Sequence, residues 1–441
     1  MTAAGPPPSV IEAIRLGSFK SFRDATLPLS PLTLVVGRNG SGKSNALDGL
    51  WVLARLAQGE DIRDALDGGR EGPAVRGGAA GCAPLGESSF SLGCTVRTGD
   101  STVDLDVRVQ TEPYVQVVYE RLAHDGDELV VTDDPGADSS DIQARWTNAK
   151  RGRNPTVVFR ASRLLATQML SRVPATEAGR RIHLAAAEVL AALRAVFVLD
   201  PVPHEMRQYV SRRDMLLHRD ARNVSAAAAS LLEDPEARGR LVEALTVLNE
   251  QEVADVTTST SELDDVMLTL RERFAGRDHP VPARVMSDGT LRFLAILVAL
   301  MQAPTVDTMP APLASEDALG QTTVVIEELE NGLHASQAAM LVGLIRDEVA
   351  RRRVRAVATA HSPALLDALT GDEHRSVVVC QRDPSGRSTL ASLVDLPNYW
   401  RIAAKGGLGQ AAVEDRLRAE EDEDVGDPVE VLEQILRGEP S

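Results

Sequence analysis

The chain has few of the features that mark secreted, zinc-binding or membrane-spanning proteins. Its three cysteines, Cys82, Cys94 and Cys380, are scattered without a CxxC pair, which predicts a reducing environment and argues against a zinc site. No apolar run approaches the roughly 20 residues that cross a bilayer. The first eight residues lack the basic and apolar regions of a signal peptide. These absences predict a cytoplasmic protein that has no contact with membranes.

Aromatic residues and repeats are also scarce. Aromatics make up 3% of the 441 residues against 43% hydrophobic residues, so the core must be mainly aliphatic. No heptad pattern is sustained and no internal repeat is evident, which excludes a long coiled coil and a solenoid. Length alone would suggest two or three domains. The motifs below instead predict one composite domain with inserted lobes.

The formal net charge of −17 excludes a protein that coats nucleic acid over its whole surface. Part of this charge lies between Glu414 and Glu439, in a tail that contains Glu420 to Asp424 and is typical of a solvated helix or a disordered end. A local basic groove remains possible, and one candidate cluster is Arg351, Arg352, Arg353 and Arg355. An arginine run of this kind is more often a solvated helix end.

The most informative stretch is the P-loop Gly37-Arg38-Asn39-Gly40-Ser41-Gly42-Lys43-Ser44. The apolar run 32–36 precedes it and predicts a strand, and the segment 45–53 after it predicts a helix. Strand, glycine turn and helix form the context that this motif requires. The alternative, a surface glycine turn, does not explain this combination.

The residue types of the P-loop suit a phosphate. Its glycines allow backbone conformations in which successive N–H groups face phosphate oxygens. The following helix adds unpaired N–H donors and the positive end of its dipole. We expect Lys43 to reach the β- and γ-phosphates and the Ser44 hydroxyl to bind magnesium. The sequence therefore predicts ATP and Mg2+ as cofactors.

A second motif is the apolar segment 321–326, which ends in Glu327 and Glu328. A continuous apolar run predicts a strand buried on both faces of a parallel sheet. Two acids at its end form the Walker B pattern, in which Glu327 would hold magnesium and Glu328 would polarise the attacking water. The alternative is two solvated acids at a strand end.

Two further segments complete the predicted site. The apolar strand 356–360 ends at His361, which we interpret as a switch histidine that hydrogen-bonds the γ-phosphate, although a lone histidine after a strand is usually structural. Upstream, Ser287 is placed to cap an apolar helix, and Gly289 permits close approach to its first turn. Together with Asp288 they match the signature motif of an ABC-type ATPase.

The remaining chain predicts the lobes. Alternating segments between 89 and 131, separated by turn residues, predict an antiparallel meander, and the glycine-rich segment 68–86 predicts a mobile loop. Helical patterns follow over 176–198, 226–232 and 240–245. The expected fold is an α/β P-loop NTPase of ABC-ATPase type with a mixed, mainly parallel core sheet. Its predicted parts are the core (10–68 and 284–397), an antiparallel β lobe (86–160), a helical lobe (161–283) and an acidic tail (411–441).

These motifs, in this order, give the chain a family resemblance. Phe19-Lys20-Ser21-Phe22, the P-loop through Asn45, the segments 287–290, 327–334 and 359–363, and the stretch 199–207 resemble the AAA-type ATPases of the ABC/SMC/RecF-like class. Relatives of that class include the ATPase half of the overcoming-lysogenization-defect (OLD) nucleases. The resemblance runs over nearly the whole chain.

The resemblance implies a head-to-tail homodimer that buries two ATP molecules, each between one subunit's P-loop and the other's signature. Ser287, Asp288 and Gly289 would then act in trans, with Ser287 and Gly289 touching the γ-phosphate. Lys20 would approach the phosphates in cis, His361 would be the switch, and Gln168 would bind magnesium.

Four features compare the chain with its relatives. Leu329 and Ala335 stand where the family commonly has proline, which predicts altered loop stiffness. Asp288 stands where transporter ATPases usually carry glycine, which favours the SMC-like branch. Too little chain follows the switch strand for the Toprim nuclease domain of OLD proteins.

The client of the ATPase is therefore expected to be separate from this chain. DNA and a separately encoded Toprim-like nuclease, in repair or anti-phage defence, are the expected clients. Two alternatives remain: an ABC transporter ATPase subunit, and a nucleotide-gated scaffold or sensor with negligible turnover.

Overall fold

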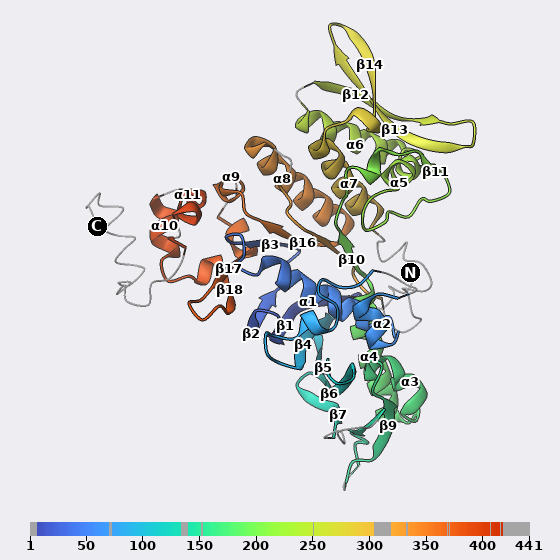
Figure 1. Cartoon of the computed structure of the whole chain (residues 1–441), viewed down its shortest axis with the longest axis vertical. Helices are drawn as coiled ribbons and strands as arrows, with labels where there is room; N and C mark the ends of the chain where they lie inside the picture. The colour runs from blue at the N-terminus through green and yellow to red at the C-terminus, as the bar shows by residue number, and fades with distance from the viewer. Residues whose placement is uncertain are drawn as a thin grey trace.

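The core of the protein is a set of parallel strands at one end of a large mixed sheet (Figure 1). The computed structural model describes residues 7–69, 73–133, 140–150, 153–249, 251–303, 319–331, 334–367, 369, 371–405, 407–414 and 416–417. The parallel strands lie in the order β10 (Val196–Leu199), β15 (Thr323–Ile326), β16 (Arg355–Ala360), β3 (Leu32–Val36) and β17 (Val377–Arg382). The strands predicted at 32–36, 321–326 and 356–360 are confirmed.

Helices cover both faces of this parallel region. Val35 of β3 packs into the same core cluster as α1 (Lys43–Leu56) and α4 (Glu177–Arg194). Its neighbour Leu34 packs on the opposite face, with α7 (Asp288–Gln302) and α8 (Ala335–Arg352). Successive side chains of a strand point to opposite faces, so one apolar strand contributes to two cores. This is why the central strands are apolar throughout.

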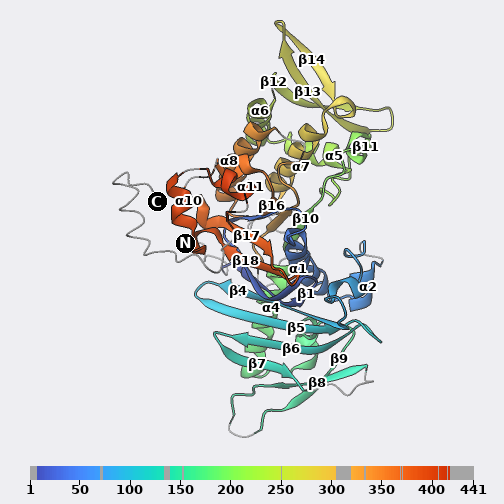
Figure 2. The same cartoon turned by 60° about the vertical axis from the view of Figure 1, so that its left-hand side comes forward.

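The antiparallel strands extend the same sheet. Beyond β17 the order runs through β18 (Ser388–Ser392), β2 (Phe22–Pro28) and β1 (Ser9–Phe19) to β4 (Ser89–Thr98), β5 (Ser101–Gln110), β6 (Gln116–His124), β7 (Asp127–Thr132), β8 (Asp141–Trp146) and β9 (Thr156–Arg160). The predicted antiparallel strands are confirmed, and Figure 2 shows them stacked below the core. They do not form a separate lobe, because β4 pairs with β1 in one 14-stranded sheet of the described residues.

The region expected to be a helical lobe, 161–283, is mixed. It contains α3 (Met169–Arg172), α4, α5 (Val224–Leu231) and α6 (Pro235–Leu248), but also β10 and a second sheet of β11 (Val210–Ser211), β12 (Glu252–Thr260), β13 (Asp265–Phe274) and β14 (Arg277–Pro282). The helix predicted to reach 198 ends at Arg194. The next residues, Val196 to Leu199, are largely β-branched or aromatic and pair as a strand beside β15, which overrides the helical spacing.

The remaining elements are short: α2 (Ile62–Asp67), α9 (Pro363–Asp367), α10 (Tyr399–Lys405) and α11 (Leu408–Val413). The acidic tail from 418 onward lies outside the described residues. Among the helices that are described, none has the length and apolarity needed to span a bilayer.

The arginine cluster around 351–355 does not form a basic groove. Arg355 is 7% exposed and donates to the carbonyls of Ile11 and Leu29, while Arg352 donates to the carbonyl of Ala303. These two side chains therefore tie the core elements together from inside.

Candidate active site

The predicted site residues meet at one edge of the parallel sheet. In the pairing register Ile326 lies beside Ala358, and Ala360 lies beside Val36. The next residues along these three strands are Glu327, His361 and Gly37. The carboxyl ends of parallel strands share an edge, so segments that are distant in sequence converge there, where ligands of open α/β sheets bind.

The P-loop glycines are required by the packing around them. Gly37 has a φ of 155°, and a Cβ there would lie 2.2 Å from the carbonyl oxygen of Cys380. Gly42 has a φ of 114°, and a Cβ there would lie 2.3 Å from Ser388 Oγ. Any side chain at either position would force the loop away from the neighbouring strands. The loop is therefore a close-fitting cradle of main-chain atoms.

Lys43, the first residue of α1, lies across this cradle. Its Nζ donates to the carbonyls of Gly37 at 2.7 Å and Arg38 at 3.1 Å. Burial lowers the pKa of the Lys43 ammonium, and the nearby carboxylates of Glu330 and Glu328 act in the opposite direction. Lys43 is thus held against the P-loop by two hydrogen bonds, with the carboxylates of Glu328 and Glu330 nearby.

Hydrogen bonds from the flanking strands brace the loop. Asn45 Nδ2 donates to Ser21 Oγ at 2.9 Å, and Ser388 Oγ lies 2.6 Å from the carbonyl of Ser41, to which it donates. Ser388 is buried and also contacts Ser21 at 2.8 Å. The exposed rim of the loop consists of Arg38, Asn39 and Gly40.

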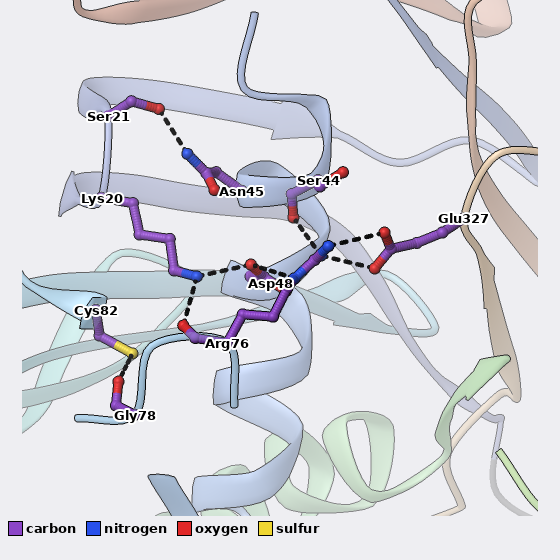
Figure 3. A network of polar contacts seen from close by, with 9 residues as sticks. All are labelled: Lys20, Ser21, Ser44, Asn45, Asp48, Arg76, Gly78, Cys82 and Glu327. Carbon is purple, nitrogen blue, oxygen red and sulfur yellow. Dashed lines mark hydrogen bonds and ion pairs between the residues drawn. The ribbon is translucent and has the colours of Figure 1, made fainter. Parts of the chain in front are cut away.

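An arginine links the acidic strand to the P-loop helix (Figure 3). Arg76 donates to both oxygens of Glu327, at 2.7 and 3.1 Å, and to Asp48 at 2.9 Å. Its Nη2 also lies 3.4 Å from the carbonyl of Ser44. Figure 3 shows the guanidinium between these groups, so Glu327 faces the start of α1.

This cluster has the chemistry of a magnesium site. Burial raises the pKa of Glu327, and Asp48 and Asp200 add to that, whereas the Arg76 cation opposes it. A cation beside this buried carboxyl group stabilises its ionised form. Carboxylate oxygens and serine oxygen are the ligands that Mg2+ prefers, and a positive group already stands among them. The residues present therefore fit the metal.

Lys20 belongs to the same cluster. Its Nζ donates to Asp48 Oδ2 at 2.7 Å and to the carbonyl of Arg76 at 3.0 Å. Its predicted approach to the phosphates stays a prediction. Neither Asp48 nor Arg76 belongs to a motif that the sequence predicts. Asp48 could have been found, because it lies four residues after Ser44 and hence on the same face of the helix.

Glu328 adopts a backbone conformation that is uncommon for a residue with a side chain. Its φ is 50°, and its N–H donates to Thr359 Oγ1 at 2.8 Å. Its side chain is exposed and accepts a hydrogen bond from Asn331 Nδ2 at 3.0 Å. Left-handed geometry at a non-glycine residue costs free energy and recurs at functional sites. The turn separates the exposed Glu328 carboxylate from that of Glu327.

His361 is oriented by a buried carboxylate that the sequence analysis did not single out. Glu330 is 7% exposed, and its Oε1 lies 3.0 Å from His361 Nδ1 and also accepts from the His361 main-chain N–H. The imidazole borders a cleft of about 660 Å³ whose opposite wall is the outer part of the P-loop. A histidine held at one nitrogen presents the other in a fixed direction.

Ser287 and Asp288 of the signature segment lie on the surface, whereas Gly289 in the first turn of α7 is buried. Ser287 is exposed and caps α7, and its Oγ accepts from the N–H of Thr290 at 3.1 Å. Arg207 donates to Asp288 at 2.6 Å and to the carbonyl of Met286 at 2.9 Å. The predicted cap is confirmed, and Arg207 fixes the loop that precedes it.

Gln168 does not lie at this site. Its side chain hydrogen-bonds main-chain groups of Arg160, and it lines a cleft with Gln58, just beyond the far end of α1. The 14 residues of α1 span roughly 20 Å, because an α-helix rises about 1.5 Å per residue. Gln168 is thus too far from Ser44 to share a metal ion with it, and that prediction is wrong.

A different acceptor, Asp200, lies near Glu327. Leu199, the last residue of β10, pairs with Ile326, so Asp200 follows beside Glu327. No sequence motif predicts this position of Asp200, which follows from the pairing of β10 with β15.

Together the P-loop at the end of β3, the acidic end of β15, and β16 between them define an α/β P-loop ATPase fold of the ABC/SMC/RecF-like class. Residues 144–367 match the family described as "AAA domain, putative AbiEii toxin, Type IV TA system", and residues 10–72 match the family described as "AAA ATPase domain". The first match spans more than half of the chain, and the chain belongs to that AAA family.

Curated relatives include the chromosome partition protein Smc of Mycolicibacterium paratuberculosis, which is 29% identical over 158 residues. The match covers 35% of this chain and 12% of that protein, so the chain spans only a small part of the relative's length.

Similar solved structures include the Smc head bound to the C-winged helix domain of ScpA, with a TM-score of 0.44, 14% identity and coverage of 87% of this chain and 97% of that chain. The SMC head domain from Thermotoga maritima has a TM-score of 0.41 and 12% identity, with coverage of 87% and 98%.

Proposed function

We propose that the protein is a cytoplasmic ATPase that binds Mg2+ and ATP at the P-loop edge of the sheet and hydrolyses ATP there. The observation that carries the proposal is that the P-loop with Lys43, Glu327 and His361 follow the carboxyl ends of three neighbouring parallel strands. Membership of an AAA family supports nucleotide binding as the starting point.

Each residue has a part that follows from its position. The P-loop N–H groups and Lys43 would bind the phosphates, and Ser44 and Glu327 would hold magnesium, which screens phosphate charge when bound. Glu328 would accept the proton of the attacking water, because it is the exposed carboxylate next to the magnesium ligand. His361, fixed by Glu330, would donate a hydrogen bond to the γ-phosphate.

We further propose that two copies pair head to tail, with Ser287, Asp288 and Gly289 completing the partner's nucleotide site. In support, Ser287 is exposed, and Arg207 donates a hydrogen bond of 2.6 Å to Asp288, the first residue of α7. A main-chain N–H donor at a helix start suits a phosphate oxygen. Closure around two ATP molecules would then be the mechanical output.

The client of this cycle is proposed to be DNA-related. Smc relatives are named for chromosome partition, and the motif order resembles OLD nucleases, so DNA and a separately encoded Toprim-like nuclease in repair or anti-phage defence fit best. A nucleotide-gated scaffold is the second candidate, because Arg76 engages Glu327 in the structure.

The proposal is tested by calorimetry and by steady-state ATPase assays. Lys43→Ala is expected to abolish ATP binding, while Arg63→Ala, an exposed residue of α2, should leave it unchanged. Turnover with and without DNA separates the two candidates. ATP binding that survives Lys43→Ala would exclude the P-loop as the site.

A further inference from the structure

A second polar cleft lies at the end of α1 opposite to the P-loop. Its lining residues come from the end of α1 and from the neighbourhood of α3 and β9, whose places in the fold can be followed in Figure 1. Its volume is about 660 Å³. Four arginines line it: Arg160, Arg163, Arg172 and Arg194. Its other lining residues are polar or glycine, and no aspartate or glutamate of the described residues is among them. The net charge of the whole chain is −17, so a cleft lined by four arginines is a positively charged region in an otherwise negatively charged protein.

Few of these charges are neutralised by the protein. Arg163 and Arg172 are exposed, and their side chains make no hydrogen bond or ion pair with any described residue. Arg160 lies 3.8 Å from Asp141. Arg194 donates its Nε to the carbonyl of Ala57 at 2.8 Å, and burial lowers the pKa of its guanidinium. Most guanidinium donors of the cleft therefore remain for another partner.

The loop that carries two of the arginines is held in place from within. Gln168 Oε1 accepts from the N–H of Arg160 at 3.0 Å, and its Nε2 donates to the carbonyls of Arg160 at 3.0 Å and Arg163 at 3.3 Å. The buried Glu120 accepts from the N–H groups of Leu165 and Ala166 at 2.7 and 2.6 Å. A loop ordered in advance loses less entropy when a ligand binds.

The donor chemistry selects the class of ligand. Guanidinium groups present planar pairs of N–H donors that match phosphate oxygens, and Ser162 lines the cleft beside them. The hydroxyls of Thr167 and Ser171 already donate to the carbonyls of Leu164 and Gln168, so the arginines are the main donors. The volume lies within the range of small-molecule sites. We propose that this arginine cleft is a binding site for a phosphate-bearing ligand, separate from the P-loop.

The test uses the full chain in a Lys43→Ala background, so that the P-loop does not contribute. The probes are sodium tripolyphosphate, measured by calorimetry, and a fluorescein-labelled single-stranded oligonucleotide, measured by anisotropy. Arg163→Gln with Arg172→Gln removes two charges from the cleft. Arg271→Gln with Arg277→Gln removes two exposed charges from the second sheet and is the matched control.

The double substitution Arg163→Gln with Arg172→Gln is expected to weaken binding of the probes about tenfold or more, because charged hydrogen bonds are stronger than neutral ones. For the oligonucleotide, the dependence of log K on log salt should become shallower by about 1.4 when two phosphate contacts are lost. Loss with tripolyphosphate alone would assign a small polyphosphate ligand, and loss with the oligonucleotide alone would assign a nucleic-acid strand.

Two results would overturn the proposal: absence of binding of both probes to the parent, or equal weakening by the control pair. Neither result bears on the ATPase, which is measured separately with Lys43 intact.

Discussion

Arg76 Nη2 lies 2.7 Å from Glu327 Oε1, although the two residues are 251 positions apart in the chain. The same guanidinium contacts Asp48 and the carbonyl of Ser44. One cation thus bridges the acidic strand and the P-loop helix at the place where magnesium is proposed to bind. Because Arg76 occupies both oxygens of Glu327, the arginine would have to give up part of this contact for Glu327 to hold magnesium.

The first prediction concerns this competition. Arg76→Gln should lower the magnesium concentration at half-saturation of ATP binding by about five- to tenfold, because a charged hydrogen-bond pair no longer has to be broken. The measurement is calorimetry of ATP binding over a magnesium series. Arg63→Gln is the control, since that side chain is 75% exposed. A higher magnesium requirement in Arg76→Gln would contradict the competition and give Arg76 a supporting part in nucleotide binding.

The second prediction concerns Glu328. Glu328→Gln should reduce turnover by about 100-fold or more, because loss of a general base commonly costs that much, while ATP binding stays close to the parent's. The measurements are steady-state phosphate release and calorimetry, with Glu262→Gln in a surface turn as control. An ATP-dependent dimer should accumulate in this variant, as seen by light scattering. Unchanged turnover would remove Glu328 from its proposed position in the mechanism.

The third prediction tests the composite site between two copies. Lys43→Ala and Ser287→Arg should each be inactive alone. Mixed in equal amounts, they should recover about a quarter of parental turnover, because half of the randomly formed symmetric dimers are mixed and each has one intact site. Mixing Lys43→Ala with Glu328→Gln is the control, since both changes fall on the P-loop side of the interface, so neither site of the mixed dimer is intact and no recovery is expected. Absence of recovery in the first mixture would mean that the signature does not act in trans.

The fourth prediction follows from the buried Glu120. Burial raises the pKa of this carboxyl from 4.5 to about 8, although the N–H groups of Leu165 and Ala166 oppose the rise. Folding therefore favours the protonated form. Its contribution to stability is complete below the pKa of the unfolded chain and is lost as the pH rises toward about 8, by up to about 1.4 kcal/mol per pH unit.

Glu120→Gln should flatten this dependence of the free energy of unfolding on pH, measured by urea denaturation between about pH 5 and 8. Glu128→Gln, which alters a side chain 52% exposed on the neighbouring strand, should keep the parental slope. An unchanged slope in Glu120→Gln would show that another group titrates over this range.

The sequence by itself determined the elements that carry local signals. The P-loop could be predicted from the sequence because Gly37 and Gly42 are required both by their backbone conformation and by close neighbouring atoms. The buried strands before Glu327 and His361 were legible because a strand covered on both faces has to be apolar throughout. The cap at Ser287 was legible because a hydroxyl before an apolar helix is a local hydrogen-bond device.

The tertiary structure decided which distant groups meet. The antiparallel strands continue the core sheet because β1, which pairs with β2 on one side, pairs with β4 on the other. The tertiary structure brought Asp200 rather than Gln168 to Glu327, because strand pairing sets neighbours irrespective of spacing along the chain. It also placed Arg76, which lies in a glycine-rich segment without a recognisable pattern, against Glu327 at the end of β15. Such contacts depend on the three-dimensional path of the whole chain, and residue order alone does not encode them in any local pattern.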